Sequence, residues 1–167
     1  MNYKFKTKPY AHQLKALERS WDKEYFAYFM EMGTGKSKVL IDNASILYDK
    51  GEINGLLLIA PKGVYKNWYD GEIPTHMVDH IEKKVVLWET SNSSIEKIKE
   101  LNTMFATGTD FHILVMNVEA FSYPKATEFA RRFLSCHKAM MAIDESTTIN
   151  TPTANRTRNI VSLKPLA

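Results

Sequence analysis

The residues best suited to chemistry form one short glycine-rich stretch, Met32-Gly33-Thr34-Gly35-Lys36-Ser37. It follows an apolar run over residues 25–30 and precedes a helical pattern of apolar residues over 39–47. A strand, a glycine-rich turn and a helix in this order are typical of a loop that holds the phosphates of a nucleotide. The glycines permit a turn that directs backbone N–H groups inward, and the start of the helix adds the positive end of its dipole.

Two side chains of this stretch complete the predicted phosphate site. Lys36 would place a positive charge on the β- and γ-phosphates, and the Ser37 hydroxyl would coordinate Mg²⁺. The general pattern G-x-x-x-x-G-K-[ST] has a glycine where this chain has Met30. The alternative, a turn whose glycines serve the backbone alone, is disfavoured because Gly-x-Gly-Lys-Ser in this setting has few other uses.

A pair of acids forms the second candidate for chemistry. Asp144 and Glu145 follow the apolar run 140–143. Phosphate-loop proteins hold Mg²⁺ with an aspartate at the end of another strand, so we expect Asp144 to bind the metal, through water. Glu145 would orient or deprotonate the attacking water. Two acids at a strand end are often plain loop charges, but their combination with the 33–37 loop favours a metal site.

The elements that must position these residues alternate along the chain. We predict strands over residues 25–30, 56–60, 84–88, 112–116 and 138–143. We predict helices over residues 10–21, from the phosphate loop to 49, 64–72, 95–105, 120–134 and 153–163. In the helix over 95–105, one apolar face carries Ile95, Ile98, Leu101 and Phe105. The alternation, and the unbroken apolar run over 56–60, predict an α/β fold with a mainly parallel sheet buried on both faces.

Composition limits the remaining possibilities. The 167 residues, 44% hydrophobic and 25% charged, suit one globular domain, with residues 1–9 extended and flexible. No apolar run approaches the ~18 residues of a membrane span. The single cysteine, Cys136, excludes an internal disulfide and suits a reducing compartment, so we expect a cytoplasmic protein. The net charge of +3 is too small to indicate a polyanionic partner by itself.

Taken together, these motifs resemble those of the first RecA-like domain of superfamily-two helicases and translocases, particularly the Swi/Snf-like branch. The resemblance covers residues 10 to about 163. Segments that resemble family motifs are 10–13 (the Q motif), 31–37 (motif I), 60–68 (motif Ia), 117–121 (the "NYE" segment), 144–147 (motif II) and the basic stretch over 149–158. Helicase-type loops relax the position of Met30 while they keep G-x-G-K-[ST].

The resemblance implies a fold and an activity. The fold would be a RecA-like P-loop NTPase, a three-layer sandwich with a mainly parallel central sheet. The activity would be Mg²⁺-dependent hydrolysis of ATP to ADP and phosphate by a helicase or translocase motor domain. Gln13 would select adenine and residues 32–37 would bind the phosphates. Lys36, Asp144 and Glu145 would be catalytic, and Ser37 and Asp144 would hold Mg²⁺.

A nucleic-acid partner is also implied, DNA more than RNA. Pro61, Lys62 and Asn117 would contact its backbone. Trp68 of the same segment could stack on a base, but we expect it in the core. Arg156 and Arg158 are either a solvated helix face or further nucleic-acid contacts.

The chain departs from the family pattern in two places. Thr147 stands where motif II has His or Asp, a residue that couples the ATP site to the domain interface. A motif III strand would follow about where residues 164–167 stand, and the second RecA-like domain, which supplies the arginine finger, is absent from this chain. We therefore expect weak nucleotide binding and poor hydrolysis by this chain alone.

Other interpretations compete with the motor domain. A phosphate-loop kinase would need a lid rich in arginine, and no such insertion lies between the strands. A non-catalytic module that binds nucleic acid or a partner could keep the same fold. His76 and His80 have a spacing that could put two metal ligands on one helix face, but neither a third ligand nor the glutamate of a metalloprotease helix accompanies them. Cys136 and His137 are not expected to form a nucleophilic dyad.

Overall fold

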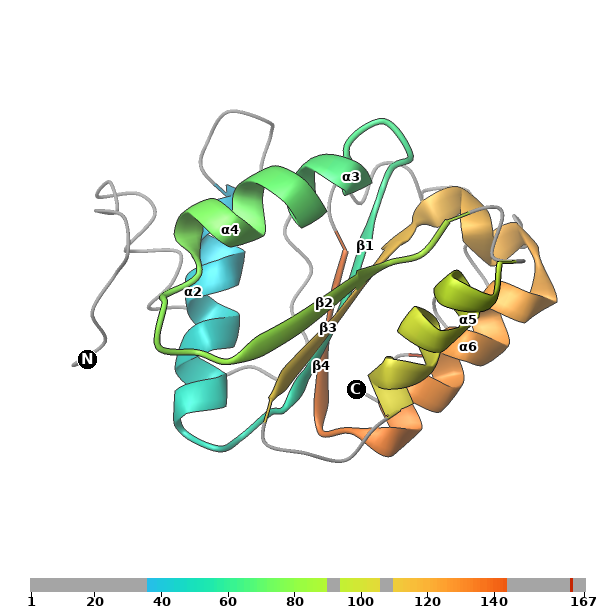
Figure 1. Cartoon of the computed structure of the whole chain (residues 1–167). Coiled ribbons are helices and arrows are strands. Elements are labelled where there is room, and N and C mark those ends of the chain that lie inside the picture. The colour runs from blue at the N-terminus through green and yellow to red at the C-terminus, as the bar shows by residue number, and fades with distance from the viewer. Residues whose placement is uncertain (1–35, 90–93, 106–109, 144–162, 164–167) are drawn as a thin grey trace.

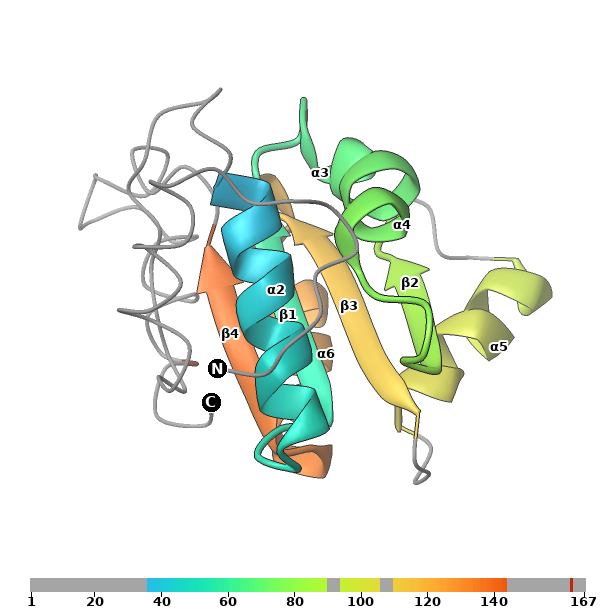
Figure 2. The same cartoon turned by 90° about the vertical axis from the view of Figure 1, so that its left-hand side faces the viewer.

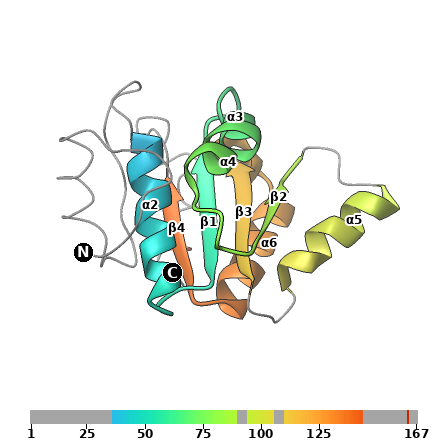
Figure 3. The ribbon, with the colours of Figure 1, turned by 60° about the vertical axis from the view of Figure 1, so that its left-hand side comes forward.

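In the part of the chain that the structure describes, four parallel strands form one sheet. The computed structural model describes residues 36–89, 94–105, 110–143 and 163. The strands are β1 (Gly55–Ala60), β2 (Lys83–Leu87), β3 (Phe111–Asn117) and β4 (Ala139–Ile143). Their order in the sheet is β2-β3-β1-β4, and every neighbouring pair is parallel (Figure 3). The four strands predicted over 56–143 are confirmed to within a residue or so at each end. The strand predicted over 25–30 lies outside the described residues.

Helices cover both faces of this sheet. They are α2 (Lys36–Asp49), α3 (Tyr65–Asn67), α4 (Ile73–His76), α5 (Ile95–Asn102) and α6 (Pro124–Cys136). Short 3₁₀ turns follow α5 (Thr103–Phe105) and precede α6 (Val118–Ser122). Figures 1 and 2 show α2, α3 and α4 on one face and α5 and α6 on the other. The predicted three-layer α/β arrangement is therefore confirmed.

Alternation along β1 assigns its side chains to the two faces. Leu56, Leu58 and Ala60 pack in the core beneath α2 and the 65–76 helical segment. Leu57 and Ile59 pack in the core beneath α6. All six residues of the strand are buried, which explains why its sequence is an unbroken apolar run.

The helical segment after β1 is longer than predicted. Our expected helix ends at residue 72, whereas the structure continues through a π-helical turn (Trp68–Glu72) into α4, which ends at His76. Pro74 lies in the first turn of α4, where a missing N–H is tolerated. Trp68 is 3% exposed and belongs to the core, as predicted.

The predicted apolar face of the 95–105 helix is only partly buried. Leu101 is buried, whereas Ile95 is 74% and Ile98 is 46% exposed. The helix lies toward the β2 edge of the sheet (Figure 3), so only its carboxyl end reaches the core. Between these apolar residues, the Lys97 ammonium donates a hydrogen bond of 2.6 Å to the carbonyl of Leu87 at the end of β2.

A tight turn reverses the chain between α2 and β1. Gly51 has φ of 73°, the left-handed conformation that glycine adopts without strain. Its N–H donates to the Tyr48 carbonyl, and the Glu52 N–H donates to the Leu47 carbonyl, which is the Schellman pattern of a helix end. Since α2 ends at the edge where β1 begins, the two elements run in opposite directions.

Asn54, the residue before β1, connects the beginnings of three strands. Its N–H donates to the carbonyl of Lys138 (2.9 Å), and its own carbonyl accepts from the N–H of His112 (3.1 Å). Its side-chain Oδ1 accepts from the N–H of Lys138 (2.9 Å). This single residue therefore fixes the register of β1 against both of its neighbours.

No helix in the described parts of the chain is long and apolar enough to cross a membrane.

Candidate functional site

The amino end of α2 lies at the carboxyl edge of the sheet, where α/β proteins bind their ligands. A helix of 14 residues is about 21 Å long, and a strand of six is about 20 Å long, so α2 spans the full length of β1. Figure 2 shows the first turn of α2 at the end toward which the strand arrows point. Lys36 is the first residue of the helix, as expected if residues 32–35 form the loop before it.

The beginning of α2 is suited to a phosphate group. No acidic residue occurs in its first turn, so no carboxylate there competes for the N–H groups or repels an anion. Lys36 and Ser37 are described as helical backbone only. Gln13, Met32, Gly33, Thr34 and Gly35 lie outside the described residues.

The strand that precedes the predicted metal-binding acids ends at the same edge of the sheet. β4 ends at Ile143, which is paired with Ile59 near the carboxyl end of β1. Asp144 and Glu145 follow directly and lie outside the described residues, as do Thr147, Arg156 and Arg158. The described backbone thus brings the start of α2 and the end of β4 to one edge, which is what a shared nucleotide and Mg²⁺ site requires.

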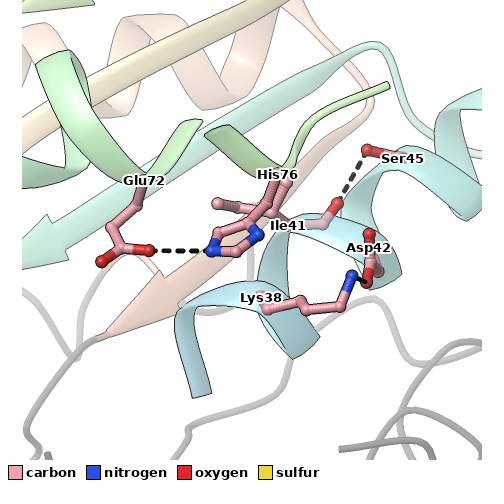
Figure 4. A network of polar contacts seen from close by, with 6 residues as sticks. All are labelled: Lys38, Ile41, Asp42, Ser45, Glu72 and His76. Atoms are coloured by element: carbon pink, nitrogen blue, oxygen red, sulfur yellow. Dashed lines mark hydrogen bonds and ion pairs between the residues drawn. The ribbon is translucent and has the colours of Figure 1, made fainter. Parts of the chain in front are cut away.

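One turn into α2, a buried ion pair lies close to the predicted phosphate site. The Lys38 ammonium is 2.9 Å from Oδ2 of Asp42, and the two side chains are 4% and 1% exposed (Figure 4). Burial raises the pKa of the Asp42 carboxyl to about 6, although the hydrogen bond and charge of Lys38 act in the opposite direction. One turn further, the Ser45 hydroxyl donates a hydrogen bond of 2.7 Å to the carbonyl of Ile41. Sequence reasoning missed this pair, because Lys and Asp four apart on a helix are usually exposed.

A second group of predicted site residues meets where β1 and β3 end. Ala60 pairs with Asn117, so Pro61, Lys62 and Asn117 lie at neighbouring strand ends. Oε2 of Glu119 joins them, because it accepts a hydrogen bond from the Lys62 N–H (3.1 Å) and one from Nδ2 of Asn117 (3.4 Å). The structure therefore brings the three predicted nucleic-acid contacts together around a carboxylate.

The exposure of these residues differs. The Lys62 side chain is exposed, and Asn117 is only 5% exposed. The Pro61 carbonyl accepts hydrogen bonds from the N–H groups of Val64 and Tyr65, which is a structural role at the start of a helical segment. Of the three, Lys62 is the residue whose side chain is exposed, and Glu119 covers the amide of Asn117.

Tyr65 lies near this group and Tyr123 follows it in the chain; neither was among our predicted site residues. Burial, followed by the charges of Glu89 and Glu119, raises the pKa of the Tyr65 hydroxyl, so these carboxylates lie near it. Tyr123 is 67% exposed at the residue before α6, which begins with Pro124. The Tyr-Pro pair marks a helix start in the sequence, but its exposure depends on tertiary packing.

The two histidines with ligand-like spacing have separate carboxylate partners. His76 Nε2 is 3.3 Å from Oε2 of Glu72, one turn earlier (Figure 4). His80 Nε2 is 2.9 Å from Oδ1 of Asp49 at the end of α2. Cys136 is exposed at the end of α6, while the neighbouring His137 packs inward.

At the opposite, amino edge of the sheet, His112 and His137 stack with ring centroids 4.7 Å apart. The His137 Nε2–H donates to the Met104 carbonyl, and His112 is 4% exposed. Burial, then the charge of His137 and that of Lys84, lower the pKa of His112, whereas Asp110 acts to raise it. A proton on His112 is therefore unfavourable in the folded state.

This pair predicts a dependence of stability on pH. The unfolded chain protonates His112 around its ordinary pKa of 6.5, while the folded chain does so at lower pH. The contribution of His112 to the free energy of unfolding is therefore complete above pH 6.5 and decreases as the pH falls through that value. The free energy of unfolding of the wild type should therefore be smaller at about pH 5 than at about pH 7.5. We expect this difference to be smaller in His112→Phe, as measured by urea denaturation at the two pH values. An unchanged difference in His112→Phe would contradict the assignment.

Comparisons with known proteins support the fold. No protein-family model and no curated protein matches the chain. Among solved structures, 26 chains match. One is the SWI2/SNF2 ATPase core of Sulfolobus solfataricus in complex with double-stranded DNA, with a TM-score of 0.59 and 16% sequence identity. The match covers 98% of this chain and 37% of that chain, so this chain spans just over a third of that protein's length. At this identity the likeness shows the fold alone, an α/β fold with a parallel sheet of the RecA-like kind.

Proposed function

We propose that this chain is the ATP-binding motor domain of a DNA helicase or translocase. The observation that carries the proposal is the position of Lys36 and Ser37 at the start of a 14-residue helix, on the carboxyl edge of a parallel sheet with a helicase-like fold. That edge supplies the N–H groups of a helix start, a lysine and a hydroxyl, and the strand that precedes Asp144 and Glu145 ends there.

Each residue of the proposed site has a role. Gln13 selects adenine, and residues 32–35 with Lys36 hold the phosphates. Ser37 and Asp144 would hold Mg²⁺, which would supply positive charge to neutralise the phosphates. Glu145 orients the attacking water and accepts its proton. A second RecA-like domain, supplied by the rest of a longer protein or by a partner, would bring the arginine that completes hydrolysis.

The proposed contact with nucleic acid lies at the group around Lys62. The SWI2/SNF2 core with the similar fold is in complex with double-stranded DNA, and we propose DNA as the partner here also. The exposed ammonium of Lys62 would pair with a backbone phosphate, with Pro61 and Asn117 fixing the ends of the two strands beside it. ATP would close two domains around the nucleic acid, and hydrolysis would reopen them.

The test is to measure Mg²⁺-ATP binding by calorimetry and turnover by phosphate release, with and without DNA. We expect weak binding and turnover near background, because loss of an arginine finger costs about 10³–10⁵ in rate. Addition of a second RecA-like domain and DNA should then stimulate turnover. Fast turnover without DNA would instead favour a self-contained NTPase or kinase, and no binding at all would favour a non-catalytic module.

A further inference from the structure

The group around Glu119 has the geometry of an anion site that is already filled by the protein itself. Oε2 of Glu119 accepts the N–H of Lys62 at 3.1 Å and the Nδ2–H of Asn117 at 3.4 Å. A single anionic oxygen between a backbone N–H and a side-chain amide is the arrangement in which proteins commonly bind a phosphate oxygen. The two donors come from the ends of β1 and β3, so the backbone of the sheet fixes their separation.

These donors are the ones that a nucleic-acid backbone would need. Asn117 is 5% exposed, and its Nδ2–H donates to Oε2 of Glu119. The Lys62 N–H points to the same oxygen. A phosphate at this position would therefore find both donors already bonded to Glu119 and would be repelled by its negative charge.

The Glu119 carboxylate is held weakly enough to leave. Its bond from Asn117, at 3.4 Å, is near the upper limit of hydrogen-bond length. Among the described residues, neither Lys nor Arg forms an ion pair with Glu119, and the side chain is only half-buried. The nearby Lys62 ammonium is exposed and can attract a phosphate from solvent.

We infer that the carboxylate of Glu119 stands in the place of a backbone phosphate oxygen and must leave its two donors before DNA binds there. Glu119 is thus a specificity residue that opposes DNA in the free protein. Its negative charge opposes the approach of a phosphate to Lys62 until the carboxylate is displaced. This inference rests on the nucleic-acid contact proposed above.

The test is the affinity of the chain for a short fluorescein-labelled DNA duplex, measured by anisotropy for the wild type and for Glu119→Gln. The glutamine keeps the shape and an oxygen acceptor but removes the charge. We expect Glu119→Gln to bind about threefold to tenfold more tightly at low salt, and the gain to shrink at high salt because screening weakens the repulsion. A purely structural role of Glu119 would give no such gain.

Two controls isolate the effect. Glu52→Gln removes the same charge from an exposed residue at the amino edge of the sheet, and it should leave the affinity at the wild-type value. In the wild-type chain, the amide resonance of Lys62 in ¹⁵N–¹H NMR spectra should shift on addition of the duplex, a measurement that does not depend on the stability of a variant.

The possible outcomes separate the inference from the proposed function. If the wild type binds the duplex and Glu119→Gln binds equally or more weakly, the role of Glu119 is wrong while the nucleic-acid contact stands. If neither protein binds the duplex and the Lys62 resonance stays in place, both the contact and the role of Glu119 are overturned.

Discussion

Replacing Lys36 with alanine is expected to weaken Mg²⁺-ATP binding by about tenfold to a hundredfold. Lys36 is the first residue of α2, at the carboxyl edge of the sheet, and in our proposal its ammonium contacts the β- and γ-phosphates. A hydrogen bond to a charged group contributes about 1.5–3 kcal/mol, which corresponds to this change in Kd. Residual turnover should fall below detection, because the same charge stabilises the transferred phosphoryl group.

The measurement is a calorimetric titration with Mg²⁺-ATP, accompanied by a thermal melt to confirm that the variant folds. Lys99→Ala on the exposed side of α5 removes an equal charge from the other face of the sheet and should bind as the wild type does. If Lys36→Ala retains wild-type affinity in a folded protein, the phosphates do not bind at the start of α2, and the proposed site is wrong.

Replacing Gly55 with alanine is expected to lower the free energy of unfolding by about 1–3 kcal/mol through overpacking. Gly55 is the first residue of β1. A methyl group there would lie 3.0 Å from Cβ of His137, 3.3 Å from Cζ of Phe133 and 3.4 Å from Cβ of Ala139. Because a Cβ atom moves only with its backbone, the end of α6 or the start of β4 would have to shift.

The matched control is Gly63→Ala, since nothing lies within 4 Å of the added methyl group at that position. Its free energy of unfolding should stay within about 0.5 kcal/mol of the wild-type value. Urea denaturation of both variants measures the difference. Equal stabilities for Gly55→Ala and Gly63→Ala would mean that the chain around His137 relaxes freely, contrary to the close packing described.

Much of this fold was predictable from local pattern. The run over 56–60 is apolar at every position, and the strand it forms is buried on both faces. Period and composition cannot say which strands are neighbours, however, and the order β2-β3-β1-β4 depends on how the connecting helices pack. The helix predicted over 64–72 is too short. Pro74 is typical of a helix boundary, yet the segment continues through a π-helical turn into α4, whose first turn accommodates the proline.

The candidate site was predictable to a lesser degree. Spacing alone is enough to predict the phosphate stretch, because its chemistry would be local to a single turn, and that prediction falls mostly outside the described residues. The bond between Lys62 and Glu119 joins residues 57 positions apart, and no sequence signal announces it. Likewise, the burial of Lys38 and Asp42 depends on what packs against α2, which helix periodicity does not determine.

The contacts of Asn54 also affect how the protein folds during its synthesis. This residue sets β1 against β4 through bonds to Lys138, which follows it by 84 positions. At a synthesis rate of about 5–20 residues per second, the ribosome needs about 4–17 s to supply that partner. During this interval the most apolar strand of the sheet is complete while at least one of its edges has no neighbour.

Such long-range pairing slows folding, because closing a large loop costs chain entropy before the native contacts repay it. The nascent segment around residues 55–60 is therefore a natural site for chaperone binding, and for aggregation when chaperones are scarce.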